Sequence, residues 1–119
     1  MYKRQKVPSC AETLAGAPQI IDFLCSDCTQ HFAQVQSFLA DLQTPFVINA
    51  RMVRGLDYYT RTAFEVTTGI LGAQNAVAGG GRYNGLVSFL GGPDVTGIGF
   101  AVGFERLVAC LPENRKDTY

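Results

Sequence analysis

Hydrophobic residues recur every three or four positions between Asp27 and Leu42, which is the spacing of one face of a helix. The residues on this face are Phe32, Val35, Phe38, Leu39 and Leu42. Thr44-Pro45 follows, and a proline shortly after a helix marks its end. We therefore predict a helix from about residue 27 to residue 42.

A shorter helix is predicted nearer the N-terminus. Ser9 and Glu12 have the spacing of a capping box, in which each side chain binds the backbone N–H of the other residue. The helix would run through Leu14, because Gly16 and Pro18 prevent it from continuing.

Beyond residue 45 the period of the pattern changes from that of a helix to that of a strand. Residues 46–48 form a short apolar run of the β type, and residues 60–68 alternate between two faces. Two further strands are predicted over residues 73–78 and 96–101, the second of them broken by glycines.

Two short helices complete the predicted elements, over residues 83–90 and 104–111. Turns of hairpin length separate the strands, and no long crossover helix lies between them, which favours an α+β fold with an antiparallel sheet. We expect a helical segment over residues 1–45 and a sheet flanked by helices over residues 46–119.

Charge and hydropathy exclude several classes of protein. Ten basic residues balance ten acidic ones among the 119 residues, so the chain lacks the electrostatic signature of a dedicated nucleic-acid binder. No long apolar run is present, so we expect neither a signal peptide nor a membrane span, and a cytoplasmic location.

Only one pair of cysteines has the spacing of metal ligands, namely Cys25 and Cys28. A structural zinc site needs two further ligands, and Cys10 and His31 are poorly spaced for that role. We therefore expect no zinc, and two thiols on adjacent turns of a helix in a reducing compartment.

Three glycines at 79–81 precede Arg82, and two interpretations of them stay open. They form either a tight turn or a segment whose backbone approaches a ligand. The run is not a Walker A loop, because no Lys-Ser or Lys-Thr follows, and its context is not that of a dinucleotide fingerprint.

Glycines also interrupt the predicted strand at 97 and 99, where a flat ligand such as a purine would lie against the backbone. Arg106 follows on the first turn of the next helix, where its guanidinium suits a bidentate contact with phosphate. Alternatively, Arg106 pairs with a nearby carboxylate of Glu105 or Glu113.

A third candidate stretch combines Arg54 with Asp57 and two tyrosines, a set that can hold a small charged substrate. Successive residues of a strand point to opposite faces. If Tyr58 and Tyr59 already lie in a strand, one contacts the ligand and the other belongs to the core.

These three stretches resemble signature peptides of one family. Residues 51–60, RMVRGLDYYT, and residues 78–87, AGGGRYNGLV, are similar to the two signature peptides of histidyl-tRNA synthetases. Residues 97–107, GIGFAVGFERL, resemble motif 3 of class II aminoacyl-tRNA synthetases. Residues 7–45 look like the end of the helical insertion of that family, so the resemblance covers almost the whole chain.

The resemblance implies an antiparallel class II sheet and a reaction in two steps. Histidine is activated with ATP and Mg²⁺ to histidyl-adenylate, and the histidyl group is then transferred to tRNA(His). The parent enzyme is expected to be a cytoplasmic homodimer.

Residue by residue, the resemblance implies a catalytic role for Arg54, which would contact both the α-phosphate and the histidine carboxylate. Tyr59 and Tyr83 would bind the imidazole of histidine. The expected ATP contacts are Arg106, Gly99 and Gly103, and the glycines expected to let the backbone approach the ligands are Gly79 and Gly80. Asp57 is expected to be structural.

Motifs 1 and 2 and the anticodon-binding domain of the family have no counterpart in these 119 residues, so we expect the chain alone to be inactive. An alternative is the regulatory paralogue that serves as the regulatory subunit of ATP phosphoribosyltransferase in histidine biosynthesis. That paralogue typically lacks the first signature peptide, which is intact here. A non-catalytic binding module is a third possibility, which the zero net charge disfavours for RNA.

Overall fold

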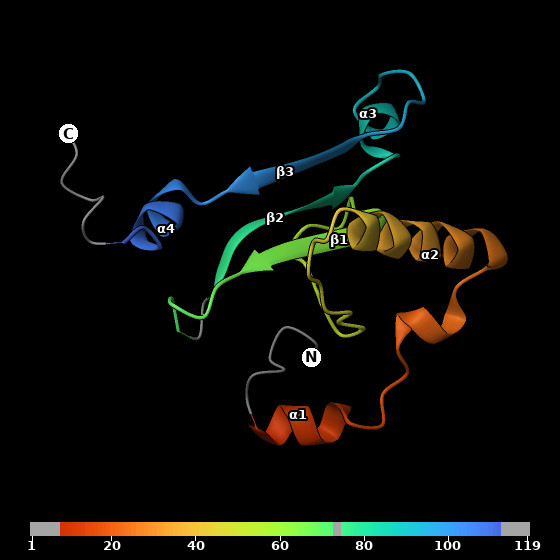
Figure 1. Ribbon diagram of the computed structural model, residues 1–119. Helices are drawn as coiled ribbons and strands as arrows, with labels where there is room; N and C mark the ends of the chain where they lie inside the picture. The colour runs from red at the N-terminus through yellow and green to blue at the C-terminus, as the bar shows by residue number, and fades with distance from the viewer. Residues whose placement is uncertain (1–7, 73–74, 113–119) are drawn as a thin grey trace. The chain divides into compact units, whose positions relative to one another are not determined.

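The computed structural model describes residues 8–72 and 75–112, which fall into two compact units, with the boundary along the chain between Gly55 and Leu56. The first unit contains helices, and the second contains a three-stranded antiparallel sheet with two short helices (Figure 1). The predicted α+β class with an antiparallel sheet is therefore confirmed.

In the first unit, α1 spans Pro8–Leu14, a 3-10 helix η2 spans Ile20–Phe23, and α2 spans Ser26–Asp41. The bounds of α2 differ by one residue at each end from those that the three- and four-residue spacing predicts. Leu14, at the end of α1, is 2% exposed and is the one buried hydrophobic residue that the structure describes in this unit.

The predicted capping box is wrong, because Ser9 lies inside α1 and is not its N-cap. Pro8 already has the helical conformation, and proline suits the first turn because its fixed φ matches the helix and it has no N–H to leave unbonded. The backbone oxygen of Ser9 instead accepts a hydrogen bond from the hydroxyl of Thr13, at 3.0 Å.

The strand predicted over residues 46–48 is also wrong. Phe46, Val47 and Ile48 lie in a segment without regular structure, and Val47 is 91% exposed. A strand needs a hydrogen-bonded neighbour. Residues 8–55 contain no other strand that would provide one, so β propensity alone is not sufficient here.

The C-terminal end of α2 has the hydrogen bonds of a Schellman motif. The N–H of Thr44 donates to the oxygen of Leu39, and the N–H of Gln43 donates to the oxygen of Ala40, both at 2.9 Å. Gln43 has a φ of 54°, in the left-handed region that glycine adopts without steric cost. Thus α2 ends in a conformation that its sequence does not favour.

We expect Gln43→Gly to raise the free energy of unfolding by about 1 kcal/mol. The reason is that a side chain on a residue in the left-handed conformation has a steric cost, which glycine removes. Gly91 provides the matched control: it has a φ of 87° and occupies the same position in the same motif after α3. Gly91→Ala should lower the free energy of unfolding by a similar amount. Urea unfolding followed by circular dichroism tests both changes, and a destabilised Gln43→Gly would contradict the assignment.

In the second unit, β1 (Thr60–Thr67), β2 (Ala76–Arg82) and β3 (Ile98–Val102) form the sheet in that order. Both pairs are antiparallel, and β2 is central. The glycines at 79–81 therefore lie in the middle of β2, so their interpretation as a tight turn is wrong. The strand expected over residues 73–78 includes residues 73–74, which lie outside the described residues.

Two short helices adjoin the sheet, α3 (Leu86–Phe89) before β3 and α4 (Phe104–Ala109) after it. The predicted helix over residues 83–90 begins later than expected, because the N–H of Tyr83 donates to the oxygen of Gly97 at 2.8 Å and extends the β2–β3 pairing. The helix predicted over residues 104–111 is confirmed except for its last two residues.

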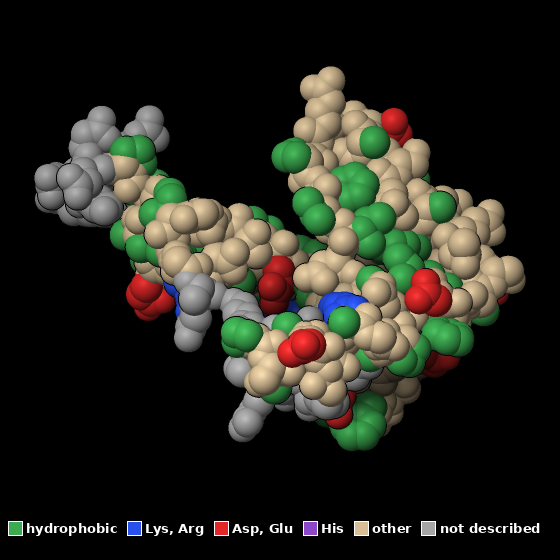
Figure 2. All heavy atoms as spheres, turned by 90° about the horizontal axis from the view of Figure 1, so that it is seen from below, with side chains coloured by type: hydrophobic (Ala, Val, Ile, Leu, Met, Phe, Trp, Pro, Cys, Tyr) green, Lys and Arg blue, Asp and Glu red, His purple; other side chains and the backbone are tan. Residues whose placement is uncertain are grey.

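One face of the sheet is apolar and exposed. Phe64 lies opposite Gly80, and Gly80 lies opposite Phe100, so these residues form one row across the three strands. The large hydrophobic side chains on this face are between 42% and 74% exposed; they are Phe64, Val66, Ile98, Phe100 and Val102. We call this the apolar face. Hydrophobic side chains also reach the surface throughout the view in Figure 2.

Within the described residues, the structure has no helix of the length and hydropathy that crossing a bilayer requires.

Candidate functional site

The opposite face of the sheet has a floor of small residues. In the register, Gly79 pairs with Ala101, and Gly81 pairs with Gly99. Because side chains alternate along strands, these four residues share the face opposite Phe100. We call it the glycine face. Gly79 and Gly81 are buried, whereas Ala101 is exposed, so the floor is covered at one part and open at another.

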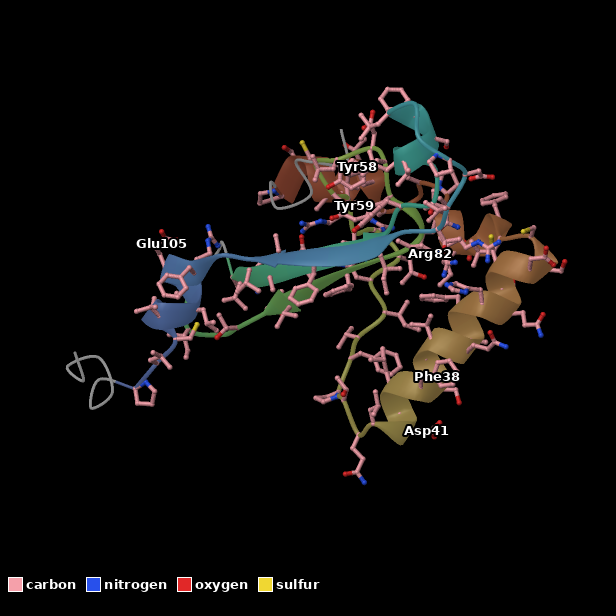
Figure 3. All side chains as sticks on the ribbon, turned by 90° about the horizontal axis from the view of Figure 1, so that it is seen from above. Phe38, Asp41, Tyr58, Tyr59, Arg82 and Glu105 are labelled. Carbon is pink, nitrogen blue, oxygen red and sulfur yellow. The ribbon has the colours of Figure 1, made fainter. Side chains whose placement is uncertain are left out.

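Three tyrosines cluster at one end of the glycine face, where β1 begins and β2 ends. The ring centroids of Tyr58 and Tyr59 are 4.9 Å apart. Tyr58 also meets Tyr83 edge-on, with centroids 5.8 Å apart. Figure 3 shows Tyr58 and Tyr59 side by side. Both precede β1, so strand alternation does not separate them, and the division into one contact and one core residue does not apply.

The tyrosine rings take up the space that the glycines leave. A Cβ on Gly81 would lie 2.8 Å from Cδ1 of Tyr59, and a Cβ on Gly97 would lie 2.6 Å from Cε2 of Tyr83. A Cβ on Gly99 would meet the hydroxyl oxygen of Tyr83. Glycine at these positions therefore allows rings of the chain itself to pack on the sheet, which is a reason that we did not predict.

Gly80 has a different environment, because its missing side chain would point to the apolar face. A Cβ there would lie 2.6 Å from Cβ of Phe100 and would meet the backbone oxygen of Gly99. Of the two glycines expected to let the backbone approach a ligand, Gly79 lies on the glycine face and Gly80 on the other.

Hydrogen bonds hold the turn that carries Tyr83. Nε of Arg82 donates to Oδ1 of Asn84 at 2.8 Å, and the N–H of Asn84 donates to the hydroxyl oxygen of Thr60 at 3.2 Å. The hydroxyl of Tyr83 donates to the backbone oxygen of Ile98 at 2.8 Å. The phenol is thus fixed against β3, and its oxygen retains the capacity to accept a hydrogen bond.

Removing the hydroxyl of Tyr83 should lower the stability of the folded chain. We expect Tyr83→Phe to lower the free energy of unfolding by about 1 kcal/mol, because the hydrogen bond to Ile98 is lost while the ring stays in place. Tyr59→Phe is the matched control, since within the described residues no hydrogen bond of the Tyr59 hydroxyl is found. Urea unfolding of both variants measures the difference, and equal effects would contradict a structural role for the Tyr83 hydroxyl.

An irregularity in β1 follows directly after Tyr59. Thr60 pairs with Arg82, but the next paired residue is Ala63, which pairs with Gly81. Arg61, in the unpaired interval, has a φ of 59°, which is rare for a residue with a side chain. Bulges of this kind redirect a strand and are frequent beside functional sites. Here the bulge lies between the tyrosine cluster and the regular part of β1.

Arg106 lies at the other end of the glycine face, on α4. Its guanidinium donates to the backbone oxygen of Ala76 at 3.0 Å, where β2 begins. Its Cδ lies over Gly103, where an added Cβ would be 3.1 Å away. The N–H of Gly103 donates to the oxygen of Val77 at 2.8 Å. The side chain is half-buried and held against the sheet, and of its two alternative partners Glu113 lies outside the described residues.

The two ends are separated by the length of β3. At about 3.3 Å per residue, five residues span roughly 15 Å. Figure 3 shows Arg82, near the tyrosine end, far along the sheet from Glu105 on α4. The structure thus brings Tyr59 and Tyr83 together through Tyr58, and it places Arg106 and Gly103 at the opposite end.

Arg54 belongs to the first unit, one residue before its boundary with the second. It is half-buried in a segment without helix or strand. Its role therefore rests on the signature peptide that contains it.

Two residues of the site were given no binding role by the sequence motifs. Tyr58 was considered only as the alternative to Tyr59, and in the structure its ring contacts both of the other tyrosines. Glu65 pairs with Gly79 and so shares the glycine face. The alternation of residues 60–68 indicates its face, but nothing in the sequence indicates that this face is functional. Within the described residues, no three His, Cys, Asp or Glu side chains are placed to share a metal ion.

Comparison with known proteins identifies the family. The family model for histidyl-tRNA synthetase matches residues 3–107. A histidine–tRNA ligase of Trichlorobacter lovleyi is 60% identical over 106 residues, which are 89% of this chain and 25% of that protein. One of Syntrophotalea carbinolica is 62% identical over 110 residues, which are 92% of this chain and 26% of that protein.

A solved structure agrees with the sequence comparisons. The crystal structure of apo histidyl-tRNA synthetase from S. aureus matches with a TM-score of 0.70 and 44% identity, over 82% of this chain and 26% of that one. The chain spans about a quarter of the length of the curated relatives that it matches. Because the family model covers residues 3–107 and these relatives are 60% and 62% identical to it, the chain belongs to the histidyl-tRNA synthetase family.

Proposed function

We propose that this chain provides one wall of the active site of a histidine–tRNA ligase, which activates histidine with ATP and transfers it to tRNA(His). The observation that carries this proposal is the glycine face, with tyrosines at one end and an arginine at the other. A face of this length, roughly 15 Å, suits an amino acid and a nucleotide bound end to end.

Histidine would bind at the tyrosine end, against Tyr59 and Tyr83. A neutral imidazole has one N–H and one bare nitrogen, and phenolic hydroxyls can accept from the first and donate to the second. The hydrogen bond from Tyr83 to Ile98 supports the role of acceptor for that phenol, because its proton is already engaged. A site built for these hydrogen bonds rejects amino acids that lack them.

ATP would bind along the floor towards Arg106. The guanidinium would hold the phosphate end, and Gly99 and Gly103 would let the nucleotide approach the backbone. Gly79 places no side chain on this face, and Gly80 allows β2 and β3 to approach on the other. ATP is expected to carry Mg²⁺ on its phosphates, and Glu65 offers a carboxylate oxygen of the kind that this ion prefers.

In the first step, the carboxylate of histidine would attack the α-phosphorus of ATP, and pyrophosphate would leave. Arg54 would contact both reacting groups and stabilise the negative charge that grows on the phosphoryl oxygens, so its contribution is electrostatic and positional. In the second step, the terminal adenosine of tRNA(His) would take the histidyl group from the adenylate.

The remaining parts of the enzyme would come from outside these residues. We propose that residues 1–45 end the helical insertion and that residues 46–119 belong to the catalytic domain. We also propose a homodimeric parent enzyme in the cytoplasm, and no aminoacylation by the 119 residues alone.

The proposal is tested by histidine-dependent exchange of pyrophosphate into ATP, measured on the whole gene product that contains this chain. We expect exchange with histidine and none with phenylalanine, which fills a similar volume but lacks the ring nitrogens. Histidine binding without exchange in a folded protein would instead indicate the regulatory paralogue. Absence of both binding and exchange would refute the synthetase assignment.

A further inference from the structure

Two cysteines lie at the start of α2, in the first unit, whereas the glycine face belongs to the second. The proposed reaction does not use them. Cys25 is the N-cap residue, with extended backbone (φ −67°, ψ 166°), and its side chain is exposed. Cys28 follows in the first turn and is half-buried. All four cysteines of the chain are described, and each is a thiol that takes part in no disulfide.

The surroundings of Cys25 favour its thiolate. The backbone N–H of Cys28 and then its thiol lower the pKa of Cys25 below the ordinary value, against smaller opposing effects of desolvation and of the Asp27 carboxylate. Low-pKa, exposed thiols at helix N-termini are the reactive ones.

We propose that Cys25 and Cys28 form a redox-active dithiol, in which Cys25 is the attacking thiol and Cys28 is the resolving thiol. Cys25 is the N-cap of α2 and Cys28 is in its first turn, so both thiols lie at the same end of the helix. Residues three apart on a helix have Cβ atoms about 5–6 Å apart, somewhat beyond the spacing of a disulfide. Cys25 precedes the helix, so its backbone and side chain can close this gap while α2 stays intact.

The co-reactant is a low-molecular-weight disulfide, RSSR. The Cys25 thiolate attacks one of its sulfurs, so that an S–S bond forms between Cys25 and R while the RSSR bond breaks and RS⁻ leaves. The Cys28 thiol gives its proton to solvent, and its sulfur attacks that of Cys25. The Cys25–Cys28 bond forms and a second RS⁻ leaves. The protein loses two electrons and RSSR gains them.

The test treats the full chain with oxidised glutathione, quenches it with acid and an alkylating agent, and maps the products by mass spectrometry. Cleavage after Leu24 and Phe32 isolates residues 25–32, which contain both cysteines. We expect the mass of this peptide to be lower by that of two hydrogen atoms, and its cysteines not to be alkylated. We expect Cys10 and Cys110, both half-buried, to react at least about tenfold more slowly than Cys25.

Two serine variants separate the roles of the thiols. Cys28→Ser should accumulate a stable mixed disulfide with glutathione on Cys25, because the resolving thiol is gone. Cys25→Ser should leave Cys28 modified at least about tenfold more slowly. Serine is a good N-cap, so α2 should persist in Cys25→Ser, which circular dichroism checks. No disulfide between Cys25 and Cys28 in the folded chain, or equal rates at Cys25 and Cys10, would overturn the proposal.

Discussion

Replacement of Arg54 by alanine in the whole gene product is expected to lower histidine-dependent pyrophosphate exchange by about a hundredfold to a thousandfold. Loss of one preorganised group that stabilises transition-state charge has an effect of this size. The expected loss is larger in kcat/KM than in kcat, because Arg54 would contact the histidine carboxylate before reaction as well as the charge that grows as the bond to the α-phosphorus forms. Steady-state exchange kinetics with varied histidine and ATP measure both quantities.

Arg51 offers a matched control in the same segment. It is also an arginine, and its guanidinium donates to the backbone oxygen of Ala15 at 3.0 Å, within the first unit. Arg51→Ala should therefore change exchange by less than about threefold, as expected for loss of an exposed hydrogen bond. Equal losses in the two variants would show that the segment needs positive charge in general and would remove the specific role of Arg54.

Gly80→Ala is expected to lower the free energy of unfolding by about 2–3 kcal/mol. The added Cβ would lie 2.6 Å from Cβ and 2.7 Å from Cα of Phe100. These atoms belong to the backbone and its first side-chain atom, so they can move only if β2 and β3 separate. Overpacking of this kind costs about 1–3 kcal/mol. Urea unfolding followed by circular dichroism gives the value.

Gly69 provides the control for this prediction. It follows β1 in the same unit, and an added Cβ there would meet nothing within 4 Å. Gly69→Ala should change the free energy of unfolding by less than about 1 kcal/mol, in either direction. If both variants unfold at the same urea concentration, the close approach of β2 and β3 at Gly80 does not constrain the sheet.

The elements that sequence analysis predicted well are those that depend on local physics. The periodicity of α2 places its bounds within one residue, because an amphipathic helix is formed by neighbours along the chain. The end of α3 at Gly91 is likewise local, since glycine adopts the left-handed conformation without a partner. The strand prediction for residues 46–48 was wrong because a strand depends on a hydrogen-bonded neighbour, which a local pattern does not indicate.

The glycines at 79–81 show the same limit more sharply. Their spacing was compatible with a turn or with a ligand, but the structure has them in a central strand. A Cβ at 81 would lie 2.5 Å from the backbone oxygen of Thr62 on β1 and 2.8 Å from the ring of Tyr59, and both residues are far away in sequence. The local sequence around residues 79–81 does not indicate contacts with residues so distant along the chain.

The sequence motifs named candidate residues but not their arrangement, and the roles of these residues stay a prediction. Tyr59 and Tyr83 were expected to share a pocket, and they do lie in one cluster, but the ring that joins them is Tyr58. Arg106 was expected to contact a phosphate or a carboxylate, and in the structure its guanidinium also donates to the backbone oxygen of Ala76 at the start of β2. The signature peptides name side chains, and the strand register decides which of them meet.

The tyrosine cluster also makes the site its own optical reporter. The chain has no tryptophan, so its near-ultraviolet absorption and emission come mainly from five tyrosines. Three of these form the cluster, and the other two, Tyr2 and Tyr119, lie outside the described residues. Rings in mutual contact exchange excitation energy and produce strong near-ultraviolet circular dichroism. A small molecule that enters the cluster therefore alters an intrinsic signal, and binding can be titrated without a label.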